Sequence, residues 1–129
     1  MTYATTLKRA ARHNPAWETT RIYSMATDGT GAAITDASGT FQYDLAEETF
    51  ALRDYTREDS FTIVQPYDGN ATLIVISEEG PDPDAVILWG GVFYSISEVI
   101  GGDSLRGTVR YQVKALPEDH VIPIRNNSL

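Results

Sequence analysis

A pair of adjacent glycines, Gly90 and Gly91, most constrains how this chain can fold. They separate two short apolar segments, residues 86–89 and 92–96, and a type I′ turn accepts two glycines without steric cost. The sequence therefore predicts a tight antiparallel hairpin. Further along, residues 108–115 alternate between apolar and polar side chains, which predicts a half-buried strand.

The same signals recur along the rest of the chain. Period-two alternation or a short apolar run predicts further strands, or strand-like segments, at residues 22–25, 40–45, 49–52, 60–65 and 71–76. Glycine, proline and short polar residues predict turns or connections at residues 54–59, 66–70, 77–84 and 101–107. Many short strands at close spacing predict an all-β domain, either a small antiparallel β-barrel or a sandwich.

The two ends of the chain depart from this pattern. Apolar residues at helical spacing predict one short helix at residues 5–13, with Thr5 or Thr6 as its cap. The last residues contain prolines and a polar cluster, so they are expected to be extended, and partly disordered unless a partner orders them. We expect a single β-barrel domain over residues 1–129, with an N-terminal helical arm at 1–16 and a C-terminal tail at 117–129.

Residues 28–39 are rich in glycine, alanine, threonine, serine and aspartate. This composition predicts a mobile loop or an extended hairpin tip within the all-β fold. Its glycines have neither the lysine of a phosphate-binding loop nor the strand-to-helix context of a dinucleotide site. The segment is therefore not expected to bind nucleotides.

Charge is distributed unevenly along the chain. The net charge is −8, but residues 1–25 hold four bases and one acid, and the remainder holds six bases and seventeen acids. The main body, at −11, would repel a phosphate backbone, although acidity of this kind is also how small domains stay soluble. The helix places Lys8, Arg9 and Arg12 on its expected solvent side, as a docking patch for an acidic partner or simply as a solvated face.

The sequence offers few groups for catalysis or metal binding. The chain has no cysteine and only two histidines, His13 and His120, which lie near opposite ends without a recognisable partner motif. We therefore predict no catalytic residue, no metal and no cofactor. No apolar run is long enough to span a bilayer, and no secretory signal is expected.

Two alternatives from other functional classes stay open. The chain has eighteen acids, and the separation of a catalytic carboxylate pair is a three-dimensional property, so a small acid-dependent hydrolase is one alternative. The other is a carbohydrate- or protein-binding β-domain of a tail or surface appendage, because aromatic side chains can form a stacking platform. Aromatic residues in strands are more often core residues, and the candidates here are Trp17, Trp89, Phe93 and Tyr94.

The hairpin region, residues 84–116, resembles the last strands of the head-completion proteins of tailed phages, also called stopper or head-tail joining proteins. An apolar strand leads through a tight glycine turn into an aromatic strand, then through a Gly/Asp loop into a long final strand. The aromatic strand carries Tyr94, Ile96 and Val99, and the loop carries Gly101, Gly102 and Asp103. An N-terminal helix is not a defining part of that pattern.

The resemblance implies a structural, non-enzymatic virion component of the phage neck, made in the cytoplasm of the bacterial host. Such a protein assembles as a homo-oligomeric ring between the portal or adaptor and the tail, and helps to retain packaged DNA. DNA would pass the acidic channel without specific binding, and no membrane is involved. The resemblance also implies that the loop and the helix contact partners, through Lys8, Arg9, Arg12, Asp28, Gly29, Thr30, Gly31, Ile34 and Asp36.

Overall fold

The structure is a computed structural model that describes residues 3–54, 70–103 and 107–129, with the backbone alone for residues 102 and 103. Its elements follow one another as one helix and seven strands among the described residues: α1 (Tyr3–Ala11), β1 (Glu18–Met25), β2 (Tyr43–Arg53), β3 (Asn70–Ile76), β4 (Val86–Trp89), β5 (Val92–Asp103), β6 (Thr108–Ala115) and β7 (Ile124–Asn126). The predicted all-β class with one short N-terminal helix is confirmed.

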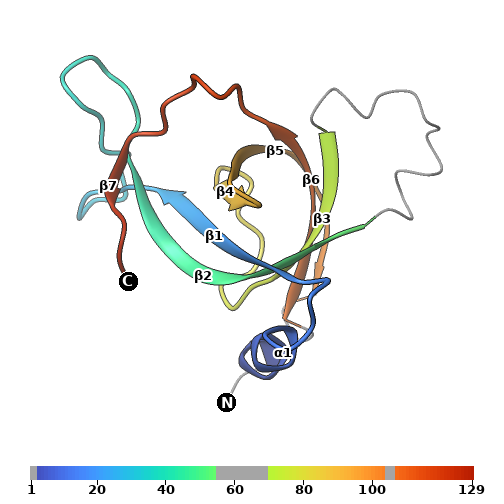
Figure 1. The fold of residues 1–129 in the computed structure, drawn as a ribbon. Coiled ribbons are helices and arrows are strands. Elements are labelled where there is room, and N and C mark those ends of the chain that lie inside the picture. The colour runs from blue at the N-terminus through green and yellow to red at the C-terminus, as the bar shows by residue number, and fades with distance from the viewer. Residues whose placement is uncertain (1–2, 55–69, 104–106) are drawn as a thin grey trace.

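Six strands close into an antiparallel β-barrel (Figure 1). Their order around the barrel is β1, β4, β5, β6, β3 and β2, and the pairing of β2 with β1 completes the ring. Of the two predicted forms, barrel or sandwich, the barrel is therefore the one adopted. Closure gives each of the six strands a partner on both sides over at least part of its length, which reduces the free edge through which open sheets aggregate.

The barrel interior is filled by one side of each strand. The alternation predicted for residues 108–115 is confirmed, because Val109, Tyr111 and Val113 are buried while Arg110, Gln112 and Lys114 are exposed. The principal core contains aliphatic side chains around one tyrosine, namely Ile22, Ala51, Ala71, Leu73, Val75, Ala85, Ile87, Val109, Tyr111 and Val113. Burial of this apolar surface is the main term that stabilises the fold.

The hairpin predicted at Gly90 and Gly91 is present, with φ angles of 58° and 79° at the two residues. Two consecutive positive φ angles are the signature of the type I′ turn. The strand that follows is longer than predicted, since β5 continues into the segment expected to be a loose connection. Register shifts between Ile96 and Glu98, and again between Val99 and Gly101, interrupt the alternation of inward and outward side chains. The sequence of the second half of β5 therefore shows no regular strand pattern.

Strand β2 joins two segments that were predicted separately. Residues 40–45 and 49–52 were expected as two elements, but one strand runs through both and begins only at Tyr43. The prediction of two elements was wrong because a glutamate is normally expected to face water and therefore to interrupt a half-buried strand, whereas Glu47 is buried inside β2. The predicted elements at residues 55–59, 60–65 and 66–69 lie outside the described residues.

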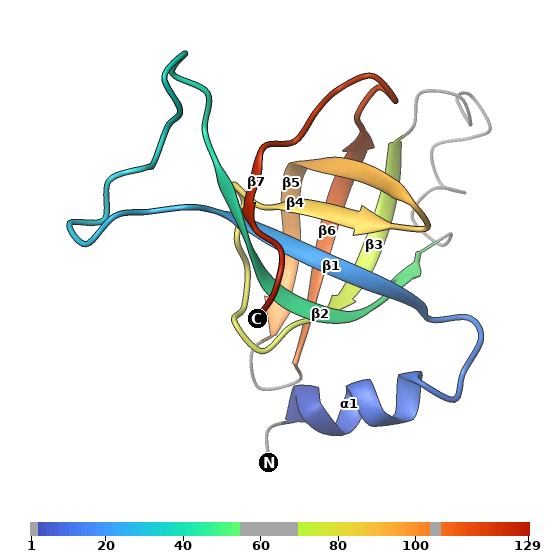
Figure 2. The same ribbon diagram turned by 60° about the vertical axis from the view of Figure 1, so that its left-hand side comes forward.

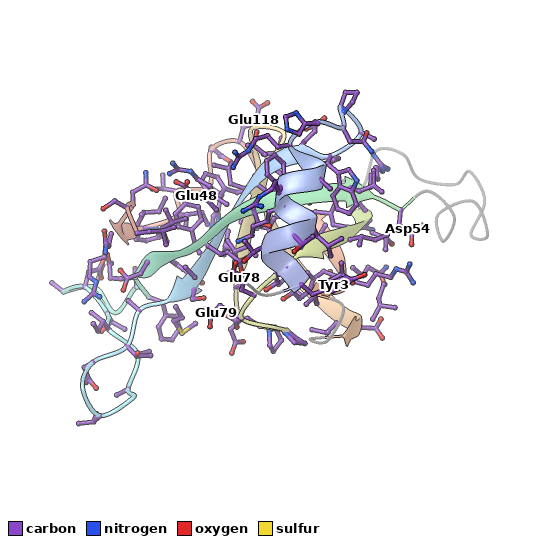
Figure 3. All side chains as sticks on the ribbon, turned by 90° about the horizontal axis from the view of Figure 1, so that it is seen from below. Tyr3, Glu48, Asp54, Glu78, Glu79 and Glu118 are labelled. Carbon is purple, nitrogen blue, oxygen red and sulfur yellow. The ribbon has the colours of Figure 1, made fainter. Side chains whose placement is uncertain are left out.

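Helix α1 closes one end of the barrel (Figures 2 and 3). Ala4, Leu7 and Ala11 pack in a second apolar cluster with Trp17, Phe50 and Ile76. The predicted start was wrong: the helix begins at Tyr3, so Thr5 and Thr6 lie inside it and do not cap it, and Ala10 is exposed. The helical arm is thus packed against the barrel and does not project from it.

The C-terminal tail is docked on its own barrel, so the prediction of partial disorder was wrong. Strand β7 pairs in parallel with the start of β2, where Tyr43 donates its amide to the Pro123 carbonyl at 2.8 Å. The tail docks because the barrel strands carry apolar side chains on their outer side, which the tail covers. A third cluster places Ile122 and Ile124 of the tail among outward-facing side chains that include Tyr23, Val86, Leu88 and Phe93.

Asn127 secures the end of this tail, and its removal should be measurable. The buried Tyr23 donates its hydroxyl to Asn127 Oδ1 at 2.7 Å, and Arg21 donates to the same oxygen at 2.9 Å. We expect Asn127→Ala to cost about 1 kcal/mol in the free energy of unfolding, because the Tyr23 hydroxyl loses its acceptor. Denaturant titration measures the change, and Asn127→Asp, which keeps an acceptor oxygen, should lose less.

Candidate interaction site

Between β1 and β2 the chain leaves the barrel as a projecting element, residues 26–42, which we call the arm (Figure 2). The segment predicted as a mobile loop or extended hairpin tip lies within it. The arm consists of two small hairpins in succession. Isolated bridges join Thr27 to Ala33 in the first hairpin and Thr35 to Phe41 in the second.

The first hairpin is organised around the side chain of Asp28. Its Oδ1 accepts hydrogen bonds from the Thr30 amide at 2.8 Å, the Thr30 hydroxyl at 2.6 Å and the Ala32 amide at 3.1 Å. Main-chain bonds from Gly31 to Asp28 and from Asp28 to Ala32 close the loop. Gly31 has a φ of 86°, as the three-residue hairpin loop with a terminal left-handed residue requires.

The second hairpin repeats this set of bonds around Asp36. Its Oδ1 accepts from the Ser38 amide at 2.9 Å, the Ser38 hydroxyl at 2.8 Å and the Thr40 amide at 3.0 Å. The main-chain bonds also recur, from Gly39 to Asp36 and from Asp36 to Thr40, and Gly39 has a φ of 82°. The two hairpins are therefore copies of one local structure.

The hairpins meet the β1–β2 ladder at a three-way junction. Ile34 donates its amide to the Ala26 carbonyl at 2.8 Å, Ala26 donates to Gln42 at 2.8 Å, and Gln42 donates to Ile34 at 3.0 Å. Each residue gives one main-chain bond and accepts one, so the three form a closed cycle. This cycle fixes where both hairpins leave the barrel.

A sequence signal for this arrangement exists, although the prediction of a loop did not include it. Residues 26–33 and 34–41 are successive eight-residue units that share the pattern Thr-Asp-x-Thr/Ser-Gly at their second to sixth positions. The three junction residues occupy the first position of each unit and the position that would begin a third. The repeat is short and consists of small polar residues, so its composition is that of an ordinary loop. Only the eight-residue spacing of Asp28 and Asp36 distinguishes it from such a loop.

The arm carries negative charge that no described base neutralises. Asp28 and Asp36 are its only ionisable side chains, and no ion pair to either occurs within the described part of the chain. Hydrogen bonds from Thr30 hold the pKa of Asp28 below its usual value, and those from the Thr40 amide and Ser38 do the same for the pKa of Asp36. Phe41, at the base of the second hairpin, is 47% exposed.

The arm should respond to loss of the Asp36 carboxylate. We expect Asp36→Ala to disorder the second hairpin, because three hydrogen bonds lose their acceptor, whereas Asp36→Asn keeps an acceptor oxygen and should preserve it. Hydrogen exchange at the Thr40 amide reports the difference. The first hairpin is an internal control, and equal exchange in both variants would contradict the assigned role.

Acidification provides a second test of the same carboxylates. The pKa of each is lowered on folding, so the stabilisation is complete above the unfolded value of about 3.9 and is lost as pH falls through the lower folded value. We expect the Thr30 and Thr40 amide resonances to titrate below about pH 4. In Asp36→Asn the Thr40 resonance should become insensitive to acid while that of Thr30 still titrates.

The three basic residues predicted on the solvent side of α1 have different surroundings. The prediction was wrong for Lys8, whose Nζ lies 2.7 Å from the buried Glu47 carboxylate and 3.6 Å from Glu78. Arg9 and Arg12 are exposed, as predicted, and make no ion pair with a described residue. The structure also separates these residues from the arm, because the two elements lie on different sides of the barrel (Figures 1 and 2).

The other candidate groups do not form one site. Trp17, Trp89 and Phe93 belong to three different apolar clusters, and Tyr94 contacts Trp89, with 6.0 Å between the ring centroids. His13 and His120 are exposed. Within residues 3–54, 70–103 and 107–129, no group of three or more histidines and acids has a geometry that could hold a metal ion.

The architecture is that of a closed six-stranded antiparallel barrel with a helix across one end and a projecting arm. No family model and no curated protein sequence matches the chain. Among solved structures it is similar to protein SF1141 of Shigella flexneri 2a, at 13% identity over 82% of this chain and 99% of that chain, with a TM-score of 0.48. None of the described helices has the length and apolar character needed to cross a membrane.

Proposed function

We propose that this protein is a structural assembly module, a head-completion or stopper protein that forms a ring in the neck of a tailed phage. The arm carries the proposal. It projects from a closed barrel, and beyond its buried base at Ala26 it is held by the hydrogen bonds of its two hairpins and their junction; none of its residues belongs to the three apolar clusters of the described residues. A surface element built in this way contributes little to the stability of its own barrel. Its role in this proposal is to contact a neighbouring molecule.

The remaining support comes from the strands and the charge. The hairpin region that resembles the stopper family forms β4, β5 and β6, three consecutive walls of the barrel. A net charge of −8 suits a ring through which DNA passes, because like charges keep the nucleic acid from adhering to the channel. The partners would be the portal or adaptor on one side and the tail on the other, with no cofactor.

Particle mass tests this function directly. The protein should be analysed by sedimentation velocity and negative-stain electron microscopy, alone and with the portal complex encoded in the same genome. We expect ring-shaped particles, or incorporation into the portal particle when the isolated protein is monomeric. A protein that is monomeric alone and stays monomeric with that complex would sink the proposal.

A further inference from the structure

We infer that copies of this protein associate head to tail, with the second hairpin of the arm, residues 35–41, seated on the C-terminal half of helix α1 of the next copy. The inference rests on the proposed ring and names the surfaces that would form it. It follows from two charged surfaces of opposite sign that the molecule presents on different sides. Each surface also carries an exposed apolar residue, Phe41 on the hairpin and Ala10 on the helix.

The donor surface is the second hairpin. Asp36 is exposed, fixed in position by three hydrogen bonds, and unpaired with any base in the described part of the molecule. Phe41 stands across the hairpin, bridged to Thr35, and leaves nearly half of its surface in water. A preformed hairpin of this kind loses little conformational entropy on docking, which favours association.

The acceptor surface is the outer side of α1 near its end. Arg9 lies in the last turn of α1, and Arg12 follows the end of the helix three positions further on, so the two exposed side chains are neighbours. Ala10 is also exposed and flanks Arg9 on the side away from Arg12. The first turn of the helix is less suited to an acidic partner, because Glu78 and Glu79 lie beside it in Figure 3. Glu78 is held there by the Thr5 hydroxyl at 2.9 Å. Attraction for an acidic hairpin is therefore concentrated at Arg9 and Arg12.

A second copy is the occupant that these surfaces favour. The rest of the molecule is strongly acidic, so two copies repel one another unless a basic patch meets an acidic one. Within one copy the arm and α1 lie on different sides of the barrel, so the acidic charge of the arm cannot pair with the arginines at the end of the helix (Figures 1 and 2). A contact between unlike surfaces of identical subunits is heterologous, and such contacts close into rings when the rotation between subunits allows.

Cysteine crosslinking tests the contact cleanly, because the chain has no cysteine of its own. One variant carries Ala37→Cys in the second hairpin, another carries Ala10→Cys on α1, and a third carries Gln112→Cys on the exposed side of β6 as the matched control. All three positions are exposed, so folding should be unaffected, and dye labelling confirms that each thiol reacts. Pairs of variants are mixed and treated with a flexible bismaleimide.

We expect the mixture of Ala37→Cys with Ala10→Cys to give several-fold more crosslinked dimer than either variant alone or any mixture that contains Gln112→Cys. The yield should fall as salt is raised, and should also fall when Arg9→Ser and Arg12→Ser are added to the Ala10→Cys chain. Asp36→Asn in the partner chain should reduce it more than Asp28→Asn, which alters only the first hairpin.

Three results would overturn the inference: dominant crosslinking between identical positions, yields with Gln112→Cys that match the arm–helix pair, or yields that the arginines do not influence. These outcomes are separable from failure of the proposed function. Rings seen by microscopy without arm–helix crosslinks would reject this interface and leave the ring intact. Absence of any particle larger than a monomer, alone and with the portal complex, would reject the ring itself.

Discussion

Lys8→Ala should lower the free energy of unfolding by about 3 kcal/mol, because it leaves the buried Glu47 carboxylate without its cation. Glu47 is 5% exposed, and the Lys8 ammonium lies 2.7 Å from it. The carboxylate also accepts hydrogen bonds from the Ser77 hydroxyl and the Glu78 amide, so it cannot turn towards water without breaking them. Thermal unfolding should shift down by roughly 10 °C.

Two further variants separate charge from packing in this result. Arg9→Ala removes a neighbouring base that is exposed and should change stability by no more than about 0.5 kcal/mol. Adding Glu47→Gln to Lys8→Ala removes the unpaired charge while an acceptor oxygen remains, so the double variant should be more stable than Lys8→Ala alone. If Lys8→Ala and Arg9→Ala unfold at the same temperature, the buried ion pair does not hold the helix.

The elements that the sequence predicted correctly are those whose signals are local. Gly90 and Gly91 can adopt the two positive φ angles of a type I′ turn without steric cost, so the β4–β5 hairpin could be located from two residues. Strand β6 was equally clear, because its alternation is uninterrupted from Thr108 to Ala115. Barrel closure could not be predicted from local sequence, because the β1–β2 pairing that completes the barrel depends on how all six strands coil.

The features that were mispredicted depend on contacts between residues far apart in the chain. Lys8 was expected in solvent because its partner lies in the middle of β2, and a buried glutamate there also divided that strand in the prediction. The tail was expected to be partly disordered because nothing within it shows that Ile124 will find an outward-facing apolar cluster. Composition predicted where the arm lies in the sequence. Its junction could not be predicted, because it depends on main-chain hydrogen bonds among three residues that are separated in the chain.

The arm and the helix were both proposed as partner-binding elements, and the structure makes them independent of each other. The arm is stabilised by its own hydrogen bonds, whereas α1 is held by an apolar cluster and the Lys8–Glu47 pair. A change that displaces the helix should therefore leave the arm intact. This independence allows the two halves of the inferred contact to be disabled separately in one protein.

Gly107→Ala is the change best suited to displace the helix. A Cβ at this position would lie 2.8 Å from both the amide nitrogen and the Cα of Ala4, which are main-chain atoms of α1 and cannot rotate away. Gly107 also has a φ of 71°, which an alanine adopts only at a cost. We expect a loss of about 3 kcal/mol in the free energy of unfolding, from backbone strain and steric overlap together.

Gly91→Ala is the matched control for the strain. Its φ of 79° is similar, but an added Cβ would meet nothing within 4 Å, so this variant should lose only about 1 kcal/mol. Adding Ala4→Gly to Gly107→Ala should not restore stability, because the two closest atoms belong to the main chain. Denaturant titration measures all three variants, and hydrogen exchange at Thr40 should show the arm unchanged. Equal losses in Gly107→Ala and Gly91→Ala would mean that the helix does not pack closely over Gly107.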